Sequence, residues 1–120
     1  MSRSRLVFRQ LFDFESSTYS YILGCVKTRK AVIIDPVDTK VSRDYHVLKE
    51  LDLKLQYAVN THVHADHITG TGWLKALIPS CQSVLSKAAG GQADVLIDDG
   101  HVIEFGDQAL ECRLTPGHTN

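Results

Sequence analysis

The stretch NTHVHADHITG, residues 60–70, contains three of the chain's six histidines and one aspartate within six consecutive positions. It directly follows residues 57–59 (YAV), a short apolar run that predicts an interior β-strand. A helix is predicted next, with apolar side chains between residues 73 and 78, and Pro79 is expected to end it. The histidines are therefore expected at the carboxyl end of a strand, where the chain passes into a helix.

The spacing of these polar side chains suits a single binding point. Side chains two positions apart on an extended segment point to the same side, so His62 and His64 can converge. If the backbone turns into a helix near Ala65, Asp66 and His67 lie in its first turn and face the same point. The positive end of the helix dipole would then favour negatively charged species there.

Three imidazoles and one carboxylate are donors that Zn²⁺ and Fe²⁺ accept, and they suffice for one or two ions. The alternatives are a solvated polar loop, or a helix that Asp66 caps. The density of donors directly after a strand favours the metal site. A second motif, LTPGHT at residues 114–119, places His118 where a predicted strand ends, so His118 is expected to be a distant ligand. His46 and His101 have no such context and are expected at the surface or in turns.

Composition is that of an ordinary globular domain. The 120 residues are 43% hydrophobic and 22% charged, enough for one domain with a real core. A net charge of −1 gives no basic field that would attract nucleic acid or an anionic membrane. No apolar run approaches the roughly 20 residues that span a bilayer. Cys25, Cys81 and Cys112 form no CxxC pair, which argues against a disulfide framework and for a reducing compartment.

The remaining pattern predicts a β-rich chain with helical crossovers, an α/β or α+β fold. Strands are predicted at residues 7–12, 18–24, 31–34, 57–59 and 83–86. Alternation of Leu110, Cys112 and Leu114 with charged residues predicts a last strand that leads to His118.

Two local patterns predict a helix and a hairpin. Ser42 is expected to cap a helix that runs to about Leu51, with Tyr45 and Leu48 on its inward side together with Leu51. Residues 95–97 and 102–105 flank the turn sequence DDG, which predicts a β-hairpin between them.

Residues 61–67 (THVHADH) and 115–119 (TPGHT) together resemble the HxHxDH and downstream-histidine signatures of the metallo-β-lactamase superfamily. This resemblance implies a four-layer α/β/β/α sandwich of two similar halves, with metal held between the sheets. Residues 1–120 are then expected to form a single incomplete domain, the N-terminal half. Within the superfamily, residues 31–37 (AVIIDPV) and 57–72 (YAVNTHVHADHITGTG) are most similar to glyoxalase-II-like persulfide dioxygenases.

For that branch, the resemblance implies one Fe(II) held by two histidines and one aspartate. His62 and His118 are carried over as two ligands, with His64 as a further candidate, and the aspartate would lie beyond the last residue. His64, Asp66 and His67 are implied to orient the ligands and bound water. The implied reaction oxidises glutathione persulfide with O₂ to sulfite and glutathione, and no residue is assigned a catalytic role.

Two alternatives remain open at this point. In a glyoxalase II-type thioester hydrolase, Asp66 and His67 would hold a second ion, zinc or one of a mixed pair, and a bridging hydroxide would attack the carbonyl. The motif is compatible with either chemistry. The third hypothesis is a short, non-catalytic form that acts as a binding partner, as a homodimer or paired with a complete chain.

The first twelve residues, MSRSRLVFRQLF, carry three arginines and two serines before any acidic residue. This composition weakly resembles the start of a mitochondrial transit peptide. The family resemblance also implies the mitochondrial matrix, and the cytoplasm is the alternative.

Overall fold

The computed structural model describes residues 6–61, 70–89 and 92–113. Its elements in chain order are β1 (Leu6–Asp13), β2 (Thr18–Cys25), β3 (Lys30–Ile34), the 3-10 turn η1 (Asp38–Lys40), α1 (Val41–Glu50), β4 (Lys54–Asn60), α2 (Gly70–Leu77), β5 (Gln82–Ser86), the 3-10 turn η2 (Lys87–Ala89), β6 (Val95–Ile97), β7 (Val102–Phe105) and β8 (Gln108–Glu111). In these segments, no helix is both long enough and apolar enough to cross a membrane.

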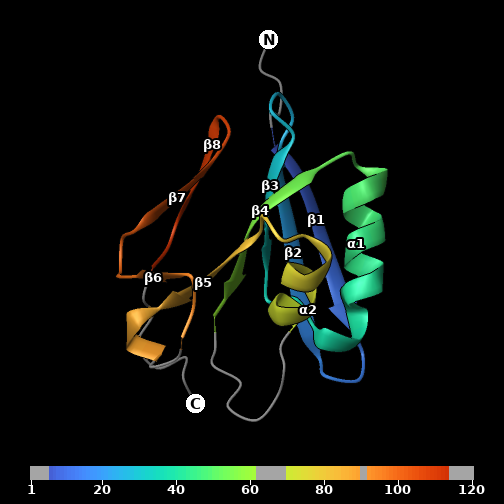
Figure 1. Ribbon diagram of the computed structural model, residues 1–120, viewed down its shortest axis with the longest axis horizontal. Coiled ribbons are helices and arrows are strands. Elements are labelled where there is room, and N and C mark those ends of the chain that lie inside the picture. The colour runs from blue at the N-terminus through green and yellow to red at the C-terminus, as the bar shows by residue number, and fades with distance from the viewer. Residues whose placement is uncertain (1–5, 62–69, 90–91, 114–120) are drawn as a thin grey trace.

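Strands β1 to β6 form one sheet in which spatial order follows sequence order (Figure 1). The first three strands are antiparallel, and β3 to β6 run parallel. Parallel neighbours need long crossover connections, and α1 and α2 lie within the two longest of these. Because the parallel strands share one direction, the ends of β3 and β4 meet at one edge of the sheet.

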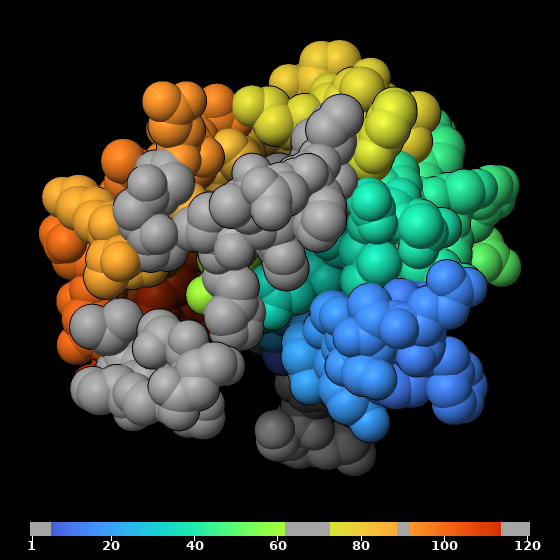
Figure 2. Space-filling model, turned by 90° about the horizontal axis from the view of Figure 1, so that it is seen from below, coloured from blue at the N-terminus to red at the C-terminus, as the bar shows by residue number. Residues whose placement is uncertain are grey.

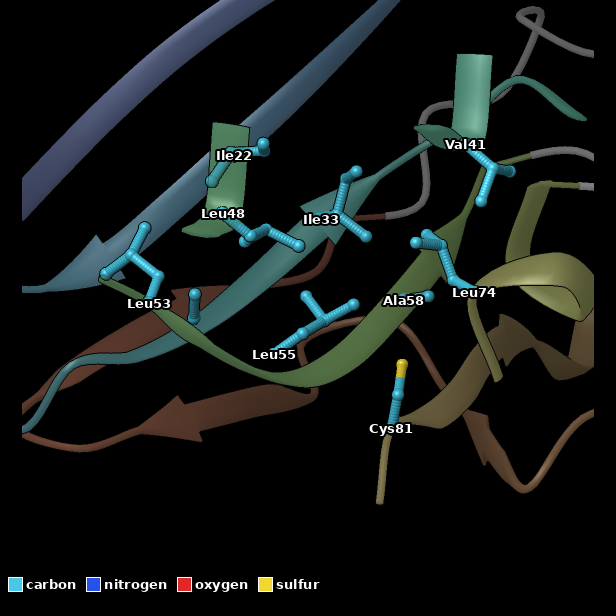
Figure 3. Close-up of a cluster of buried hydrophobic side chains, with 10 residues drawn as sticks. Ile22, Ile33, Val41, Leu48, Leu53, Leu55, Ala58, Leu74 and Cys81 are labelled. Atoms are coloured by element: carbon cyan, nitrogen blue, oxygen red, sulfur yellow. The ribbon is translucent and has the colours of Figure 1, made fainter. Parts of the chain in front are cut away.

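The face of the sheet beneath α1 and α2 carries the first of two hydrophobic cores (Figure 3). Figure 3 shows Leu48 of α1 beside Ile33 of β3 and Leu53, which precedes β4. The buried members of this core are Ile22, Ala31, Ile33, Val41, Leu48, Leu53, Leu55, Ala58, Leu74 and Cys81. The predicted helices and interior strands are thus confirmed by the apolar side chains that they bury together.

The opposite face of the sheet packs against the β7–β8 hairpin, which lies on the side away from the helices (Figure 1). Val32 of β3 belongs to this second core, whereas its neighbour Ile33 belongs to the first. The continuous apolar run of β3 therefore serves both faces, as expected for a strand covered on each side. The buried members of the second core are Cys25, Val32, Val59, Val84, Ile97, Ile103 and Phe105.

The predicted hairpin between residues 95–97 and 102–105 is wrong. The chain does turn at Gly100, which has a φ of 83°. However, β6 pairs in parallel with β5, whereas β7 pairs with β8 in a separate sheet. The reason is that β6 and β7 cover the second core from opposite sides. Ile97 enters this core from the six-stranded sheet, and Ile103 enters it from the second sheet. The DDG turn therefore carries the chain between layers, and Gly106, with a φ of 66°, lies in the actual hairpin turn.

The start of α1 also differs from the prediction. Lys40 is the N-cap and Ser42 lies within the helix, because the 3-10 turn η1 leads directly into it. The buried side chains of α1 are Val41, Asp44 and Leu48, whereas Tyr45 is only half-buried. The prediction of the inward side of the helix was thus correct at Leu48 and missed the carboxylate of Asp44.

Replacement of Leu48 by alanine tests the first core. The side chain is 2% exposed, and its loss should lower the free energy of unfolding by about 2–5 kcal/mol through lost burial and an unfilled cavity. Leu77→Ala on α2 is the matched control, because that side chain is 51% exposed and should cost much less. Urea denaturation of both variants measures the difference, and equal losses would contradict the packing described.

Cys25, the last residue of β2, joins the β2–β3 turn to the β7–β8 turn. It lies at the end of the sheet where β3 and β4 begin, opposite the end where Asp35 and Thr61 lie. Its Sγ accepts hydrogen bonds from the backbone N–H groups of Thr28 (3.5 Å) and Asp107 (3.4 Å). The turn at Gly106 must approach closely, because a Cβ atom there would collide with Thr28 Oγ1. Hydrogen bonds from Thr28, first from its side chain, and from Asp107 lower the pKa of the Cys25 thiol to about 7. Cys81 and Cys112 are free thiols as well, and burial raises the pKa of Cys81 to about 11.

The lowered pKa of Cys25 predicts a pH-dependent stability. The thiolate is favoured in the folded state over an unfolded thiol of pKa about 8.5, so its stabilisation is present above that value. It is lost as the pH falls through about 7, the pKa in the folded protein. Urea denaturation between pH 6 and 9 should show wild-type stability rising relative to that of Cys25→Ser, whose hydroxyl stays neutral. A constant difference between the two proteins across that range would contradict the assignment.

Candidate metal centre

The ends of β3 and β4 are joined by a set of short hydrogen bonds. Asp35, directly after β3, donates its N–H to the carbonyl oxygen of Val59 (2.8 Å). Its Oδ1 accepts from the backbone N–H of Thr61 (2.7 Å), and its Oδ2 accepts from the Thr61 hydroxyl (2.6 Å). The hydroxyl of Ser20 on β2 donates to the carbonyl oxygen of Asp35 (2.7 Å). Thr61, the last described residue before the histidine motif, is thereby held to Asp35 at the end of β3, and Ser20 joins Asp35 in turn to β2.

The backbone conformation of Asp35 allows its carboxylate to bind Thr61. Its φ is 53°, a left-handed conformation that aspartate adopts more readily than most residues. The following residue, Pro36, restricts the backbone of Asp35 further and prevents the strand from continuing. The sequence pattern predicts Asp35 and Pro36 only as the end of a strand. One signal could have revealed that Asp35 anchors Thr61. Asp35 is an acidic residue at the end of a buried strand, and that strand lies beside the strand that leads to the histidine motif.

The predicted metal-site residues His62, His64, Asp66, His67 and His118 all lie outside the described residues. The structure does establish their context in the chain. Residue 62 follows directly on Thr61, and α2 begins at Gly70, so the motif lies between a strand and a helix in the chain, as predicted. His46 and His101 are both exposed, as predicted, and His46 Nδ1 lies 2.7 Å from the carbonyl oxygen of Ser42 in the same helix.

Charged groups near this edge of the sheet are paired with one another. Figure 2 views this end of the molecule and shows the β1–β2 turn (blue), the segment around the start of α1 (teal) and α2 (yellow). The buried carboxylate of Asp13 accepts from the hydroxyl (2.5 Å) and the N–H (3.1 Å) of Ser16, and Lys40 Nζ lies 3.9 Å away. The side-chain hydrogen bond of Ser16 is the main cause that lowers the pKa of Asp13.

A second pair lies in the first turn of α1. Arg43 donates to Asp44 Oδ1 through Nε (3.1 Å) and Nη2 (2.9 Å), and to the carbonyl oxygen of Phe12 through Nη1 (3.1 Å). Burial raises the pKa of Asp44, and the bonds from Arg43 oppose that shift. Arg43 thereby ties α1 to the end of β1. Neither pair could be predicted from the sequence, because nothing in the local pattern shows that Asp13 and Asp44 are buried.

Nowhere in residues 6–61, 70–89 or 92–113 do three His, Cys, Asp or Glu side chains gather as a group that could hold a metal ion. The histidine motif and His118 therefore remain the predicted ligands, and they lie outside those ranges. The donors of the motif fit a divalent metal ion. Imidazoles and a carboxylate, which here follow directly on an anchored strand, are ligands that Zn²⁺ and Fe²⁺ accept.

Comparison with known proteins identifies the fold. Residues 14–90 match the family model described as the metallo-beta-lactamase superfamily. The chain belongs to this superfamily. The six-stranded sheet with its two helices is the first half of that α/β/β/α fold, as the sequence predicted.

The similarity extends over almost the whole chain. Mouse mitochondrial persulfide dioxygenase ETHE1 is 55% identical over 118 residues, which are 98% of this chain and 46% of the mouse protein. The crystal structure of ETHE1 from Myxococcus xanthus superposes with a TM-score of 0.80 at 44% identity, covering 88% of this chain and 46% of that one. A probable hydroxyacylglutathione hydrolase of Schizosaccharomyces pombe is 34% identical, covering 84% of this chain and 40% of the hydrolase. The chain thus spans about half the length of these members of the superfamily.

Replacement of Asp35 by alanine tests the anchoring of β4. The change removes both bonds to Thr61 and should lower the free energy of unfolding by about 1–3 kcal/mol. It should also speed hydrogen exchange at the Thr61 amide, because that N–H loses its acceptor. Nuclear magnetic resonance of the exchanging amides and urea denaturation provide the two measurements.

Asp52→Ala is the matched control, because Asp52 has a φ of 54° and therefore carries the same backbone cost of a left-handed alanine. A loss of stability in Asp35→Ala that is no greater than in Asp52→Ala would show that the bonds to Thr61 contribute little.

Proposed function

We propose that this chain forms the first half of an iron-dependent persulfide dioxygenase. The observation that carries the proposal is the 55% identity to mouse persulfide dioxygenase over 98% of the chain. The identity to the S. pombe hydrolase is 34% over 84% of the chain. The histidine motif alone is compatible with both chemistries, and this difference in identity favours the dioxygenase.

The proposed reaction converts glutathione persulfide, O₂ and water into glutathione, sulfite and two protons. The sulfur–sulfur bond breaks, the outer sulfur is oxidised to sulfite, and O₂ is reduced. A ferrous ion, one per complete site, would supply the redox chemistry with O₂. His62 and His118 would hold that ion, and the third ligand, an aspartate, would come from the part of the relatives that this chain does not span.

The residues of this chain contribute position and orientation. The two hydrogen bonds that Asp35 accepts from Thr61 fix the backbone there, so the proposed ligand His62 follows an anchored point at the end of β4. His64, Asp66 and His67 would orient the ligands and bound water through hydrogen bonds. Precise placement is valuable here, because a displacement of about 1 Å can cost a hundredfold in rate.

A site with two histidine ligands and no aspartate ligand lacks one coordinate bond to the iron. It also lacks the negative charge with which that aspartate would neutralise part of the charge of the ion. The 120-residue chain alone should therefore bind iron weakly and show little or no turnover. The mouse relative is a mitochondrial protein by name, and we infer the same compartment for this one.

A chimaera tests the proposed function. Residues 1–120 replace the matching part of mouse persulfide dioxygenase, and O₂ consumption is measured with glutathione persulfide. The chimaera should be active, and His62→Ala should abolish that activity by removing a ligand. His46→Ala is the matched control and should keep it, because His46 is exposed on α1.

An inactive but folded chimaera would contradict the proposal. Hydrolysis of a hydroxyacylglutathione thioester without O₂ consumption would instead support the binuclear hydrolase. Rapid turnover by the 120-residue chain alone would refute the dependence on a second half.

A further inference from the structure

Helix α2 is held on the sheet by few buried side chains. Within residues 73–77, Leu74 alone is fully buried, whereas Trp73 is 50% exposed and Leu77 51%. Ile78, directly after the helix, adds a partly buried contact with the first core. Because Leu74 and Ile78 are four residues apart, both lie on one side of the helix. An attachment on a second side is therefore needed to fix how α2 is turned about its axis.

Lys75 supplies that attachment, since consecutive helix residues point about 100° apart. Its Nζ donates to Oδ2 of Asp94, the residue before β6. The same oxygen accepts from the backbone N–H of Ser83 in β5 (2.9 Å), and the N–H of Asp94 donates to Ser83 Oγ (2.8 Å). Asp94 is thus fixed to the sheet by two reciprocal bonds, and Lys75 joins α2 to Asp94.

The pair between Lys75 and Asp94 is a charged one. Both side chains are only 36% exposed, so the two charges are partly withdrawn from water. The hydrogen bond from Lys75 is the main cause that lowers the pKa of Asp94, and the backbone N–H of Ser83 acts in the same direction. Asp94 is therefore ionised at neutral pH, and a charge-assisted bond of this kind is stronger than a bond between neutral groups.

The helix that this pair fixes is the one that follows the histidine motif. It begins at Gly70, three residues after His67, and Lys75 lies five residues further on. That distance is about 7.5 Å along the helix axis, so a rotation of α2 would also displace its first residue. The motif therefore has an anchor on each side. Asp35 holds Thr61 before it, and the ion pair holds the helix after it.

We propose that Lys75 and Asp94 are positioning residues for the metal ligands of the histidine motif. Their ion pair sets the orientation of α2 and thereby the direction in which the motif enters the helix. Neither side chain is assigned a contact with metal or substrate, because the pair acts through α2. This inference rests on the proposed function for the identity of the metal, and on the described bonds for the anchoring.

Lys75→Met tests the anchoring in the 120-residue chain itself, because methionine keeps most of the aliphatic side chain and removes the ammonium group. The amide of Ile78 donates to the carbonyl oxygen of Leu74 (2.7 Å) at the end of α2. Hydrogen exchange at that amide should become at least about tenfold faster. Lys27→Met is the matched control, because Lys27 also pairs with an aspartate (3.8 Å from Asp107) but lies in the β2–β3 turn.

The chimaera that joins residues 1–120 to the rest of mouse persulfide dioxygenase tests the effect on the metal site. Co²⁺ is the probe, because imidazole and carboxylate bind it and its visible absorption depends on ligand geometry. Lys75→Met should bind Co²⁺ at least about tenfold more weakly and with an altered absorption spectrum. With Fe²⁺, kcat should fall at least about tenfold, because misplaced ligands slow the reaction. The KM for glutathione persulfide should change little, since neither residue is placed against the substrate.

Two further variants separate positioning from general stability. Lys75→Arg should restore Co²⁺ affinity, spectrum and kcat, because the guanidinium can still pair with Asp94. Asp94→Asn removes the charge but keeps an oxygen for the Ser83 N–H, and it should reproduce the effects of Lys75→Met. The double variant should be no worse than either single variant, because both remove the same pair.

Unchanged Co²⁺ affinity and spectrum in Lys75→Met would overturn the proposal, even if thermal stability fell, because the role of the pair would then be structural only. Equal effects of Lys75→Met and Lys27→Met would overturn it as well. An inactive wild-type chimaera would instead contradict the proposed function, and the exchange and Co²⁺ measurements do not depend on that activity.

Discussion

The parallel pairing of β3 with β4 is the constraint on which the rest of the structure depends. It places Asp35 and Thr61 at adjacent strand ends, and the carboxylate of Asp35 then closes both bonds to Thr61. The same pairing requires a crossover helix, and α1 covers the first core as a result. The histidine motif thus starts from a point at which two strands of the sheet are firmly joined.

Much of this arrangement could be predicted from local patterns. The apolar run in β3 and the proline after α2 identify a buried strand and the end of a helix because each reflects a short-range rule. The DDG turn misled for the opposite reason. Whether β6 pairs with β7 or with β5 depends on which core Ile97 and Ile103 fill, and that is a property of the whole sheet.

The candidate site shows the same division. Its predicted donors, three histidines and an aspartate within six positions, come from the sequence alone and lie outside the described residues. The groups that support the site were not visible. The bonds of Asp35 and those of Arg43 to Phe12 join residues from different elements, and only the folded chain brings them together.

The central claim is that residues 1–120 hold half of a metal site. Anaerobic calorimetric titration with Fe²⁺ tests this claim most directly, when it compares the 120-residue chain with the chimaera that joins residues 1–120 to the rest of mouse persulfide dioxygenase. We expect weak binding to the chain alone and about one tightly held iron in the chimaera. Equally tight binding of one iron by both proteins would contradict the claim, because the site would then be complete without a second half.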